Sequence, residues 1–263
     1  MRVGVIIPAA GQSRRFGDLD KLAQDLGGRA VLLRTVELFT KRDDVVAIVI
    51  AGPPDDLENF KTRYGPALSF HGAKIVAGGR VDRWESVRNA LAALPDDLTH
   101  IAIHDAARPC ASVDLLARVF DAAKVASAVI PGVTVTSTLK RVSETTVSAA
   151  EDDAVASAIL GDFGMQATRG RAVTATIDRE NLVLAQTPQI FDAALLRRAY
   201  ASANLVGTTD DASVVEQLGE TVVVVEGDSR NLKITTQDDL ALARAIMGIK
   251  SSSSSQSSSY RFE

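Results

Sequence analysis

Cationic side chains cluster just after the first apolar run of the chain, in the segment PAAGQSRRFG that begins at Pro8. Three cations within eight positions, Arg14, Arg15 and Lys21, follow the small residues Ala9, Ala10 and Gly11. Small residues let backbone N–H groups approach a phosphate closely, and cations neutralise its charge, so this pattern is typical of a polyphosphate-binding loop. The loop is neither a Walker A motif nor a dinucleotide fingerprint, because Gly-Lys-Ser/Thr and Gly-x-Gly-x-x-Gly are both absent. A solvated basic turn beside a strand is the alternative interpretation.

A carboxylate follows a later strand-like run, in the segment HDAARP. Asp105 would lie at the carboxyl end of that strand, where ligands bind in open α/β sheets. A carboxylate there suits Mg²⁺ that is shared with substrate phosphates, and Arg108 can hold an anionic group. The alternative is a turn that begins at Asp105 and closes at Pro109. We interpret His104 as a packing or hydrogen-bonding residue rather than a metal ligand.

Two further segments carry candidate binding residues. In GGRVDRWES the glycine pair Gly78-Gly79 permits a loop that lies against a ligand, and Ser86 is interpreted as the N-cap of the helix that follows. In RNLKIT a strand-like segment contains Lys233. A lysine in such a context can bind an anion, or it can simply extend its ammonium group into solvent.

Apolar runs and helical patterns alternate along the chain. We predict strands at Val3–Pro8, Val45–Ala51, Lys74–Ala77, His100–His104, Ser127–Gly132, Asn181–Ala185 and Thr221–Val225. We predict helices at Ala30–Phe39, Leu57–Tyr64, Ser86–Leu94, Val113–Ala126 (capped by Ser112), Ala193–Ala203, Asp211–Leu218 and between Thr236 and Gly248. This alternation predicts an α/β protein with a mostly parallel, twisted sheet and helices on both faces.

Two segments depart from the alternation. From about Val133 to Thr174 the chain is rich in Thr, Ser, Ala and acidic residues, and we interpret this part as an extended arm with a loop insertion. After the last helix, SSSSSQSSS is too polar to offset the entropy of ordering it, so residues 249–263 are predicted to be a disordered tail.

Composition narrows the class of protein. The 263 residues carry a net charge of −4, which is unlike a basic nucleic-acid binder. One cysteine and three histidines without zinc-motif spacing exclude a disulfide framework and a multi-cysteine metal site. No apolar run approaches the roughly 20 residues that span a bilayer. We therefore expect a cytoplasmic enzyme without a nucleic-acid or membrane partner.

The motifs occur in a specific order: PAAG with Arg15 and Lys21, GG…R..S, HDAARP, V.ST.K at Val135–Lys140, QTPQ.F at Gln186–Phe191, TDDA at Thr209–Ala212 and N.KITT at Asn231–Thr236. From Val3 to about Met247 the chain resembles the 2-C-methyl-D-erythritol 4-phosphate cytidylyltransferase family of the non-mevalonate isoprenoid pathway. The resemblance implies a Rossmann-like nucleotidyltransferase fold over residues 1–248, with a protruding dimerisation arm at about 133–180 and an insertion at about 142–172. It also implies Mg²⁺, CTP, a polyol phosphate and a homodimer.

The resemblance implies a role for each matched residue. Arg15 and Lys21 would stabilise the triphosphate and the departing pyrophosphate, Asp105 would bind Mg²⁺, and Lys233 would lie over the α-phosphate. The cytidine pocket would comprise Ala9, Ala10, Gly11, Gly79, Ser86 and Ala106. The polyol phosphate would be held by Arg108, Thr138, Thr187 and Arg179, with Arg179 reaching in from the partner subunit.

Some positions depart from the family pattern, and alternatives stay open. Ser137 stands where the family usually has Asp, and Leu22 replaces the Gln that usually follows the lysine. A cytidylyltransferase for another sugar-alcohol phosphate, such as ribitol 5-phosphate, is the nearest alternative. A catalytically silent nucleotide-binding protein is the second.

Overall fold

The computed structural model describes residues 1–11, 16, 20–149, 168–202 and 204–249. The chain divides into two compact units, one of Met1–Val133 with Ala185–Glu263 and one of Thr134–Leu184. Arg14, Arg15, residues 150–167 of the predicted insertion and the Ser-rich segment lie outside the described residues.

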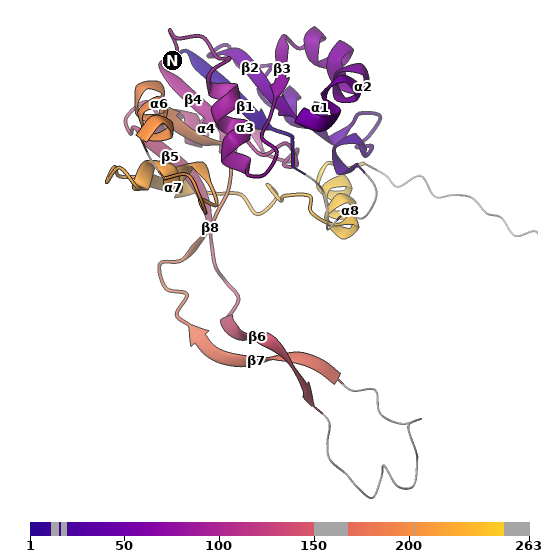
Figure 1. Ribbon diagram of the computed structural model, residues 1–263, viewed down its shortest axis with the longest axis vertical. Coiled ribbons are helices and arrows are strands. Elements are labelled where there is room, and N and C mark those ends of the chain that lie inside the picture. Colours follow the sequence, from indigo (N-terminus) through magenta and orange to yellow (C-terminus); the bar gives the residue numbers. More distant parts are fainter. Residues whose placement is uncertain (12–15, 17–19, 150–167, 203, 250–263) are drawn as a thin grey trace, which may run out of the picture. The chain divides into compact units, whose positions relative to one another are not determined.

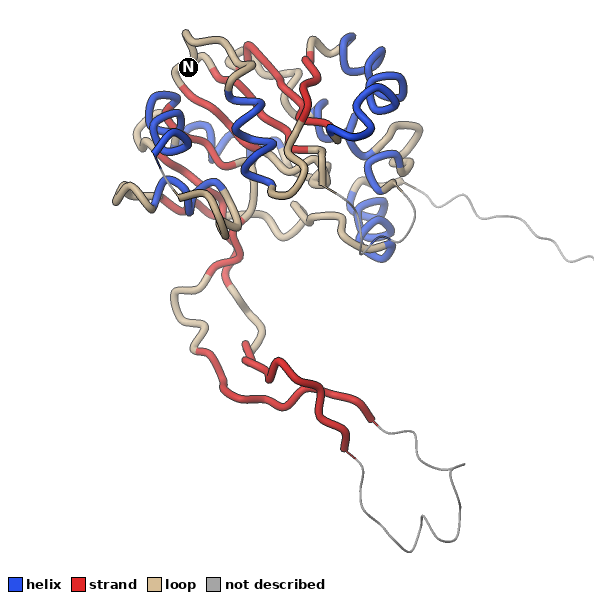
Figure 2. The backbone as a smooth tube through the Cα atoms, in the orientation of Figure 1, coloured by secondary structure: helices blue, strands red, loops and turns tan. Residues whose placement is uncertain are grey.

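The first unit is built on a sheet with eight strands in the described part of the chain (Figures 1 and 2). The strand order is β10 (Val223–Glu226), β5 (Ala128–Thr134), β9 (Gln189–Asp192), β4 (His100–Ile103), β1 (Val3–Pro8), β2 (Val45–Gly52) and β3 (Ala73–Ala77), and β8 (Val183–Ala185) pairs with β5. The pairs β10–β5, β4–β1, β1–β2 and β2–β3 are parallel, whereas β9 runs antiparallel to both β4 and β5. The mostly parallel sheet is confirmed.

Helices cover both faces of this sheet, as predicted. Side chains alternate between the faces, so that Val5 and Ile7 of β1 enter one hydrophobic core and Ile6 enters the other. The first core receives α1 (Val31–Glu37), α2 (Leu57–Phe70), α4 (Val113–Ala122) and α8 (Gln237–Ile246). The second receives α3 (Arg83–Leu91), α6 (Ala193–Ser202) and α7 (Asp211–Glu216).

Two local predictions were wrong, and one strand was missed. Ser86 is not an N-cap, because α3 begins at Arg83 and is capped by Asp82, which forms a capping box with Glu85. The segment around Lys233 is an extended loop without strand pairing rather than a strand. Strand β9 was not predicted at all. By contrast, Ser112 does cap α4, its hydroxyl accepting from the N–H of Leu115 at 3.2 Å.

The order of the strands places two loops side by side. The chain adds β2 and β3 on one side of β1 and then crosses to add β4 on the other. The loops that leave the carboxyl ends of β1 and β4 therefore flank the point where the strand order reverses, which is the usual ligand site of such sheets. These are the loops that carry PAAG and HDAARP.

The second unit contains a two-stranded antiparallel ladder of β6 (Leu139–Ala149) and β7 (Thr168–Ile177). Leu139 pairs with Ile177 at one end of the ladder. Beyond that end, the guanidinium group of Arg179 donates to the carbonyl of Thr136. No helix in the described part of the chain is long and apolar enough to cross a membrane.

Candidate active site

Asp105 lies at the centre of a cluster of cations just beyond β4. Its Oδ2 is 3.0 Å from Lys233 Nζ and 3.2 Å from Arg108 Nε, and its Oδ1 is 3.5 Å from Arg83 Nε. These cations come from three parts of the chain: the loop before α8, the HDAARP turn and the first residue of α3. The fold thus gathers three of the predicted site residues, Asp105, Arg108 and Lys233, at the carboxyl end of β4.

These neighbouring cations stabilise the negative charge of Asp105. Burial by itself would raise the pKa of the carboxyl group, but the positive charges of Arg83, Lys233 and Arg108 hold it well below its usual range. The group is therefore a carboxylate throughout the neutral pH range, able to bind a cation or to orient one.

A chain of hydrogen bonds fixes the backbone around Asp105. The N–H of Asp105 donates to Thr187 Oγ1 at 3.0 Å, and Thr187 Oγ1 lies 3.1 Å from His104 Nδ1. His104 Nε2 is 3.0 Å from the carbonyl of Arg108, so this nitrogen carries the proton and Nδ1 accepts from the threonine hydroxyl. His104 is fully buried and packs edge-on against Phe39. The prediction that His104 is a hydrogen-bonding residue is confirmed.

Thr187 is correspondingly a buried residue of this site. Its hydroxyl group hydrogen-bonds to His104 and to the N–H of Asp105, and its carbonyl accepts from Asn231 Nδ2 at 2.8 Å. A role in binding the polyol phosphate stays a prediction.

The loop that carries Lys233 is attached directly to the HDAARP turn. The N–H of Ile234 donates to the carbonyl of Ala107 at 2.8 Å, and Arg108 Nη1 donates to the carbonyl of Asn231 at 2.7 Å. Ile234 is fully buried, whereas the side chain of Lys233 is 41% exposed. Lys233 therefore has an anchored backbone and a side chain that can leave Asp105 for an incoming phosphate.

A second group of predicted residues lies at the ends of β1, β2 and β3. The N–H of Gly78 donates to the carbonyl of Gly52, and a Cβ at Gly78 would lie 2.7 Å from the Cβ of Ala10 and 2.8 Å from Ser86 Oγ. Ser86 Oγ in turn accepts from the N–H of Gly79 at 2.9 Å. Ala10, Gly79 and Ser86 are thus brought together, and a side chain at Gly78 would push them apart.

The other residues predicted to bind the nucleoside lie in the loops that follow β1 and β4. Ala9 is buried and its N–H donates to the carbonyl of Ala51, while Gly11 is exposed with open space where a side chain would be. Ala106 is buried, and its carbonyl accepts from Thr35 Oγ1 at 2.9 Å.

Lys21 begins a short 3₁₀ helix, Lys21–Ala23. The preceding residue, Asp20, caps this turn and also accepts from Arg63 Nη1 at 2.8 Å and from the Tyr64 hydroxyl at 3.0 Å. Leu22, which departs from the family pattern, is buried in the first core. The roles of Lys21 and of Arg15, the latter outside the described residues, stay predictions.

Thr138 and Arg179 belong to the second unit, where both side chains are exposed. Thr138 directly precedes β6 and Arg179 follows the end of β7, so both lie beyond the Leu139–Ile177 end of the ladder. Their roles toward the polyol phosphate stay predictions.

Arg83 is a site residue to which the sequence patterns assigned no role. It lies within the GG…R..S motif, and its charge partner Asp211 lies in the TDDA motif. The signal that could have identified it is an arginine in one motif and a carboxylate in another, and only the fold places these two groups 2.7 Å apart.

The donor set around Asp105 fits a magnesium ion that arrives with a triphosphate. The described residues contain no cluster of three or more His, Cys, Asp or Glu side chains that could hold a metal alone. Mg²⁺ usually binds through one or two carboxylates, substrate phosphates and water, so a single carboxylate is sufficient. Three cations beside Asp105 would repel a bare divalent ion, and the phosphates would offset that repulsion.

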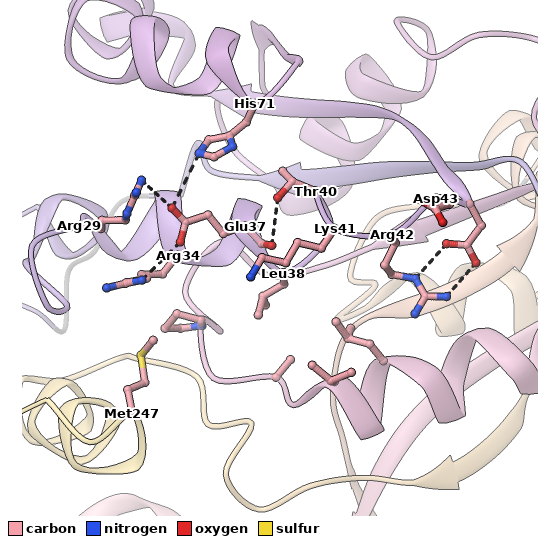
Figure 3. Close-up of a pocket in the computed structure, with 15 residues that line it drawn as sticks. Arg29, Arg34, Glu37, Leu38, Thr40, Lys41, Arg42, Asp43, His71 and Met247 are labelled. Carbon is pink, nitrogen blue, oxygen red and sulfur yellow. Dashed lines mark hydrogen bonds and ion pairs between the residues drawn. The ribbon is translucent and has the colours of Figure 1, made fainter.

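A separate cavity of about 890 Å³ lies between α1, the loop before β2 and the start of α4 (Figure 3). Several of its charged groups are paired with one another: Glu37 is 2.8 Å from Arg29, and Arg42 pairs with Asp44 at 2.8 Å. Among the predicted site residues that the structure describes, none lines it.

The buried histidine predicts a stability that depends on pH. Burial lowers the pKa of His104 to about 4, below the ordinary value of about 6.5. Between these values the unfolded chain binds the proton more readily, so stability is complete above about pH 6.5 and falls as pH drops toward 4. We expect His104→Gln to reduce the loss of thermal stability between pH 7 and 4.5, measured by calorimetry, with the half-exposed His100→Gln as control. Equal pH slopes in the parent protein and His104→Gln would contradict this assignment.

Comparison with known proteins identifies the family. The model of the family 2-C-methyl-D-erythritol 4-phosphate cytidylyltransferase matches residues 3–160 and 149–249. A curated relative of that name from Rhodococcus jostii (strain RHA1) is 38% identical over 247 residues, which cover 93% of this chain and 95% of the relative. The solved structure of a 2-C-methyl-D-erythritol 4-phosphate cytidylyltransferase from Francisella tularensis is 30% identical with a TM-score of 0.71, covering 94% of this chain and 100% of that one. The corresponding structure from Thermus thermophilus is 33% identical with a TM-score of 0.66, covering 94% of this chain and 98% of that one.

The two solved structures match this chain over 94% of its length, so the fold is shared along almost the whole chain. With its HDAARP carboxylate set among cations at the point where the strand order reverses, the chain belongs to the 2-C-methyl-D-erythritol 4-phosphate cytidylyltransferase family.

Proposed function

We propose that this protein is a nucleotidyltransferase that transfers the cytidylyl group of CTP to 2-C-methyl-D-erythritol 4-phosphate. The products are 4-diphosphocytidyl-2-C-methyl-D-erythritol and pyrophosphate. The observation that supports this best is the carboxylate of Asp105 with three cations within 3.5 Å of it, at the carboxyl end of β4.

The reaction requires no general base. A phosphate monoester has its second pKa near about 6 and is largely dianionic at neutral pH, so its oxygen can attack the α-phosphorus of CTP directly. His104, the histidine nearest in sequence to the carboxylate, is buried, and both of its ring nitrogens are engaged in hydrogen bonds. It is therefore not available to the substrate as a proton acceptor, and its role is to hold the HDAARP turn.

The difficulty of the reaction is electrostatic, because two anions must meet while pyrophosphate departs. Lys233 and Lys21, with Arg15, would neutralise the phosphates and hold the attacking and leaving oxygens in line. Asp105 would hold Mg²⁺, which when bound supplies further positive charge to the triphosphate. Ala9, Ala10, Gly11, Gly79, Ser86 and Ala106 would bind the nucleoside.

On the acceptor side we assign Arg108, Thr138, Thr187 and Arg179 to the polyol phosphate. We further propose a homodimer in which Arg179 of one subunit serves the site of the other, and a cytoplasmic location. A ribitol 5-phosphate cytidylyltransferase would differ chiefly in this acceptor pocket.

The direct test is the release of pyrophosphate from CTP with each acceptor. We expect 2-C-methyl-D-erythritol 4-phosphate to be used with a kcat/KM at least about 100-fold above that for ribitol 5-phosphate, because a pocket that hydrogen-bonds one polyol leaves polar groups unpaired with another. A preference for ribitol 5-phosphate would establish the alternative acceptor. Binding of CTP without transfer to either would establish a catalytically silent protein.

Subunit mixing tests the shared site. Arg179→Ala should raise the KM for the polyol phosphate far more than the KM for CTP, because the contact belongs to one substrate. Mixing Arg179→Ala with Lys21→Ala subunits places both lesions in one site of a heterodimer and leaves the other intact, so random exchange restores about a quarter of all sites. Absence of recovery, with exchange shown independently, would place Arg179 outside its neighbour's site.

A further inference from the structure

We propose that Arg83 is a positioning residue for the transfer reaction: it holds the Asp105 carboxylate in place and is itself held by the buried pair of Asp211 and Tyr200. The inference rests on the proposed function, since it concerns the carboxylate assigned to that reaction. The proposed role of Arg83 extends the site to α6, which carries Tyr200, and to α7, which begins at Asp211.

The four residues form one continuous chain of polar contacts. Arg83 Nε lies 3.5 Å from Asp105 Oδ1, and Arg83 Nη1 lies 2.7 Å from Asp211 Oδ2. The Tyr200 hydroxyl donates to the other oxygen of Asp211 at 2.6 Å. The guanidinium group therefore bridges two carboxylates, one at the edge of the site and one inside the core.

The inner end of this chain is rigid. The side chain of Asp211 is 0% exposed, and Tyr200 is buried in the second core. Gln189 of β9 accepts from the N–H of Asp211 at 3.2 Å and from the N–H of Ala212 at 3.0 Å. Because β9 pairs with β4, the start of α7 is fixed to the strand that leads to Asp105. Arg83 thus connects the Asp105 carboxylate to Asp211, which is itself fixed to the sheet.

The other two partners of Asp105 are less suited to this role. Arg108 lies on the same turn as Asp105, so it moves with that turn. Lys233 has a side chain that is 41% exposed, and the proposed mechanism requires it to turn toward phosphate. Among the three cations, Arg83 is the one with a second carboxylate partner in the described part of the chain. It can hold Asp105 when the other cations engage the substrate.

The planar guanidinium group is essential to this arrangement. Its N–H groups point in several fixed directions, which allows one side chain to contact carboxylates on two sides. A lysine keeps the charge but offers a single ammonium group, which cannot satisfy both carboxylates in the same geometry. Arg83→Lys therefore separates the charge of the residue from its bridging shape.

The test compares three variants with the parent enzyme by steady-state kinetics and thermal unfolding. For Arg83→Lys we expect kcat to fall by about 10- to 100-fold, because small misplacements of a reacting group are costly. KM for CTP should change by less than about 3-fold, since substrate contacts are retained. Tyr200→Phe removes the hydroxyl that donates to Asp211 and should lower kcat by about 3- to 10-fold. The control, Arg42→Lys, weakens the Arg42–Asp44 pair outside the site and should leave kcat unchanged.

Affinity for Mg²⁺ with a non-hydrolysable CTP analogue, measured by calorimetry, gives a readout independent of turnover. We expect it to weaken in Arg83→Lys and to be unchanged in Arg42→Lys. Parental kcat and affinity in both Arg83→Lys and Tyr200→Phe would overturn the inference, as would a rise in KM for CTP with kcat unchanged. If the parent enzyme itself transfers no cytidylyl group, the proposed function fails and the inference fails with it. An active parent with active variants refutes the inference alone.

Discussion

Asp105→Asn is expected to lose at least about 10²- to 10³-fold in kcat, the scale on which removal of one charge-stabilising group acts. The carboxylate is surrounded by Lys233, Arg108 and Arg83 at 3.0–3.5 Å, and asparagine has the same shape without the charge. It would neither bind Mg²⁺ as the carboxylate does nor balance these cations. The measurement is pyrophosphate release over a range of Mg²⁺ concentrations.

The fold of this variant should survive, because asparagine is isosteric and Arg83 retains Asp211 as a partner. Circular dichroism and the melting temperature would verify this. Asp44→Asn is the matched control, since Asp44 forms a comparable bidentate pair with Arg42 outside the site, at 2.8 and 3.0 Å. Near-parental activity of Asp105→Asn would show that the assignment of Asp105 to the metal is wrong.

Lys233→Ala is expected to lose at least about 100-fold in kcat/KM, which corresponds to about 2.7 kcal/mol of transition-state stabilisation. The ammonium group is 3.0 Å from Asp105 and partly exposed, so it can move to the phosphate on which negative charge develops. Lys21→Ala should show a loss of the same order. Single-turnover kinetics would report the effect on the chemical step directly.

The control for Lys233→Ala is Lys124→Ala, which removes an exposed cation paired with Asp121 at 2.6 Å. Such surface pairs contribute little, so activity and stability should both be preserved. A loss below about 3-fold in Lys233→Ala would indicate that Lys233 pairs with Asp105 without stabilising the transition state.

Continuous apolar runs made most of the sheet predictable. Val3–Ile7 and Ile48–Gly52 are buried on both faces, so their apolar character does not depend on knowing which face meets which helix. Strand β9 escaped prediction because it has four residues and enters the sheet antiparallel between β4 and β5. Its conformation is determined by partners distant in sequence rather than by its own periodicity.

The start of α3 shows how local signals compete. Ser86 and Asp82 are both residue types that cap helices, and the prediction chose Ser86. In the structure Glu85 accepts from the N–H groups of Val81 and Asp82, which completes a capping box at Asp82. Ser86 is thereby placed one turn into the helix, where its hydroxyl is available to Gly79.

The sequence by itself determined the candidates at the strand ends: Asp105 and Arg108 from HDAARP, Lys233 from N.KITT and the small residues of PAAG. These signals are local: a carboxylate or a small-residue turn that follows an apolar run predicts a ligand site at a strand end, whichever elements pack around it. Whether Lys233 extends into solvent or pairs with a carboxylate was decided by the tertiary structure alone, through the hydrogen bond between Ile234 and Ala107 that brings the two loops together. The bridge from Asp105 through Arg83 to Asp211 was decided in the same way, because an ion pair depends on distance in space, which the fold sets and sequence separation does not.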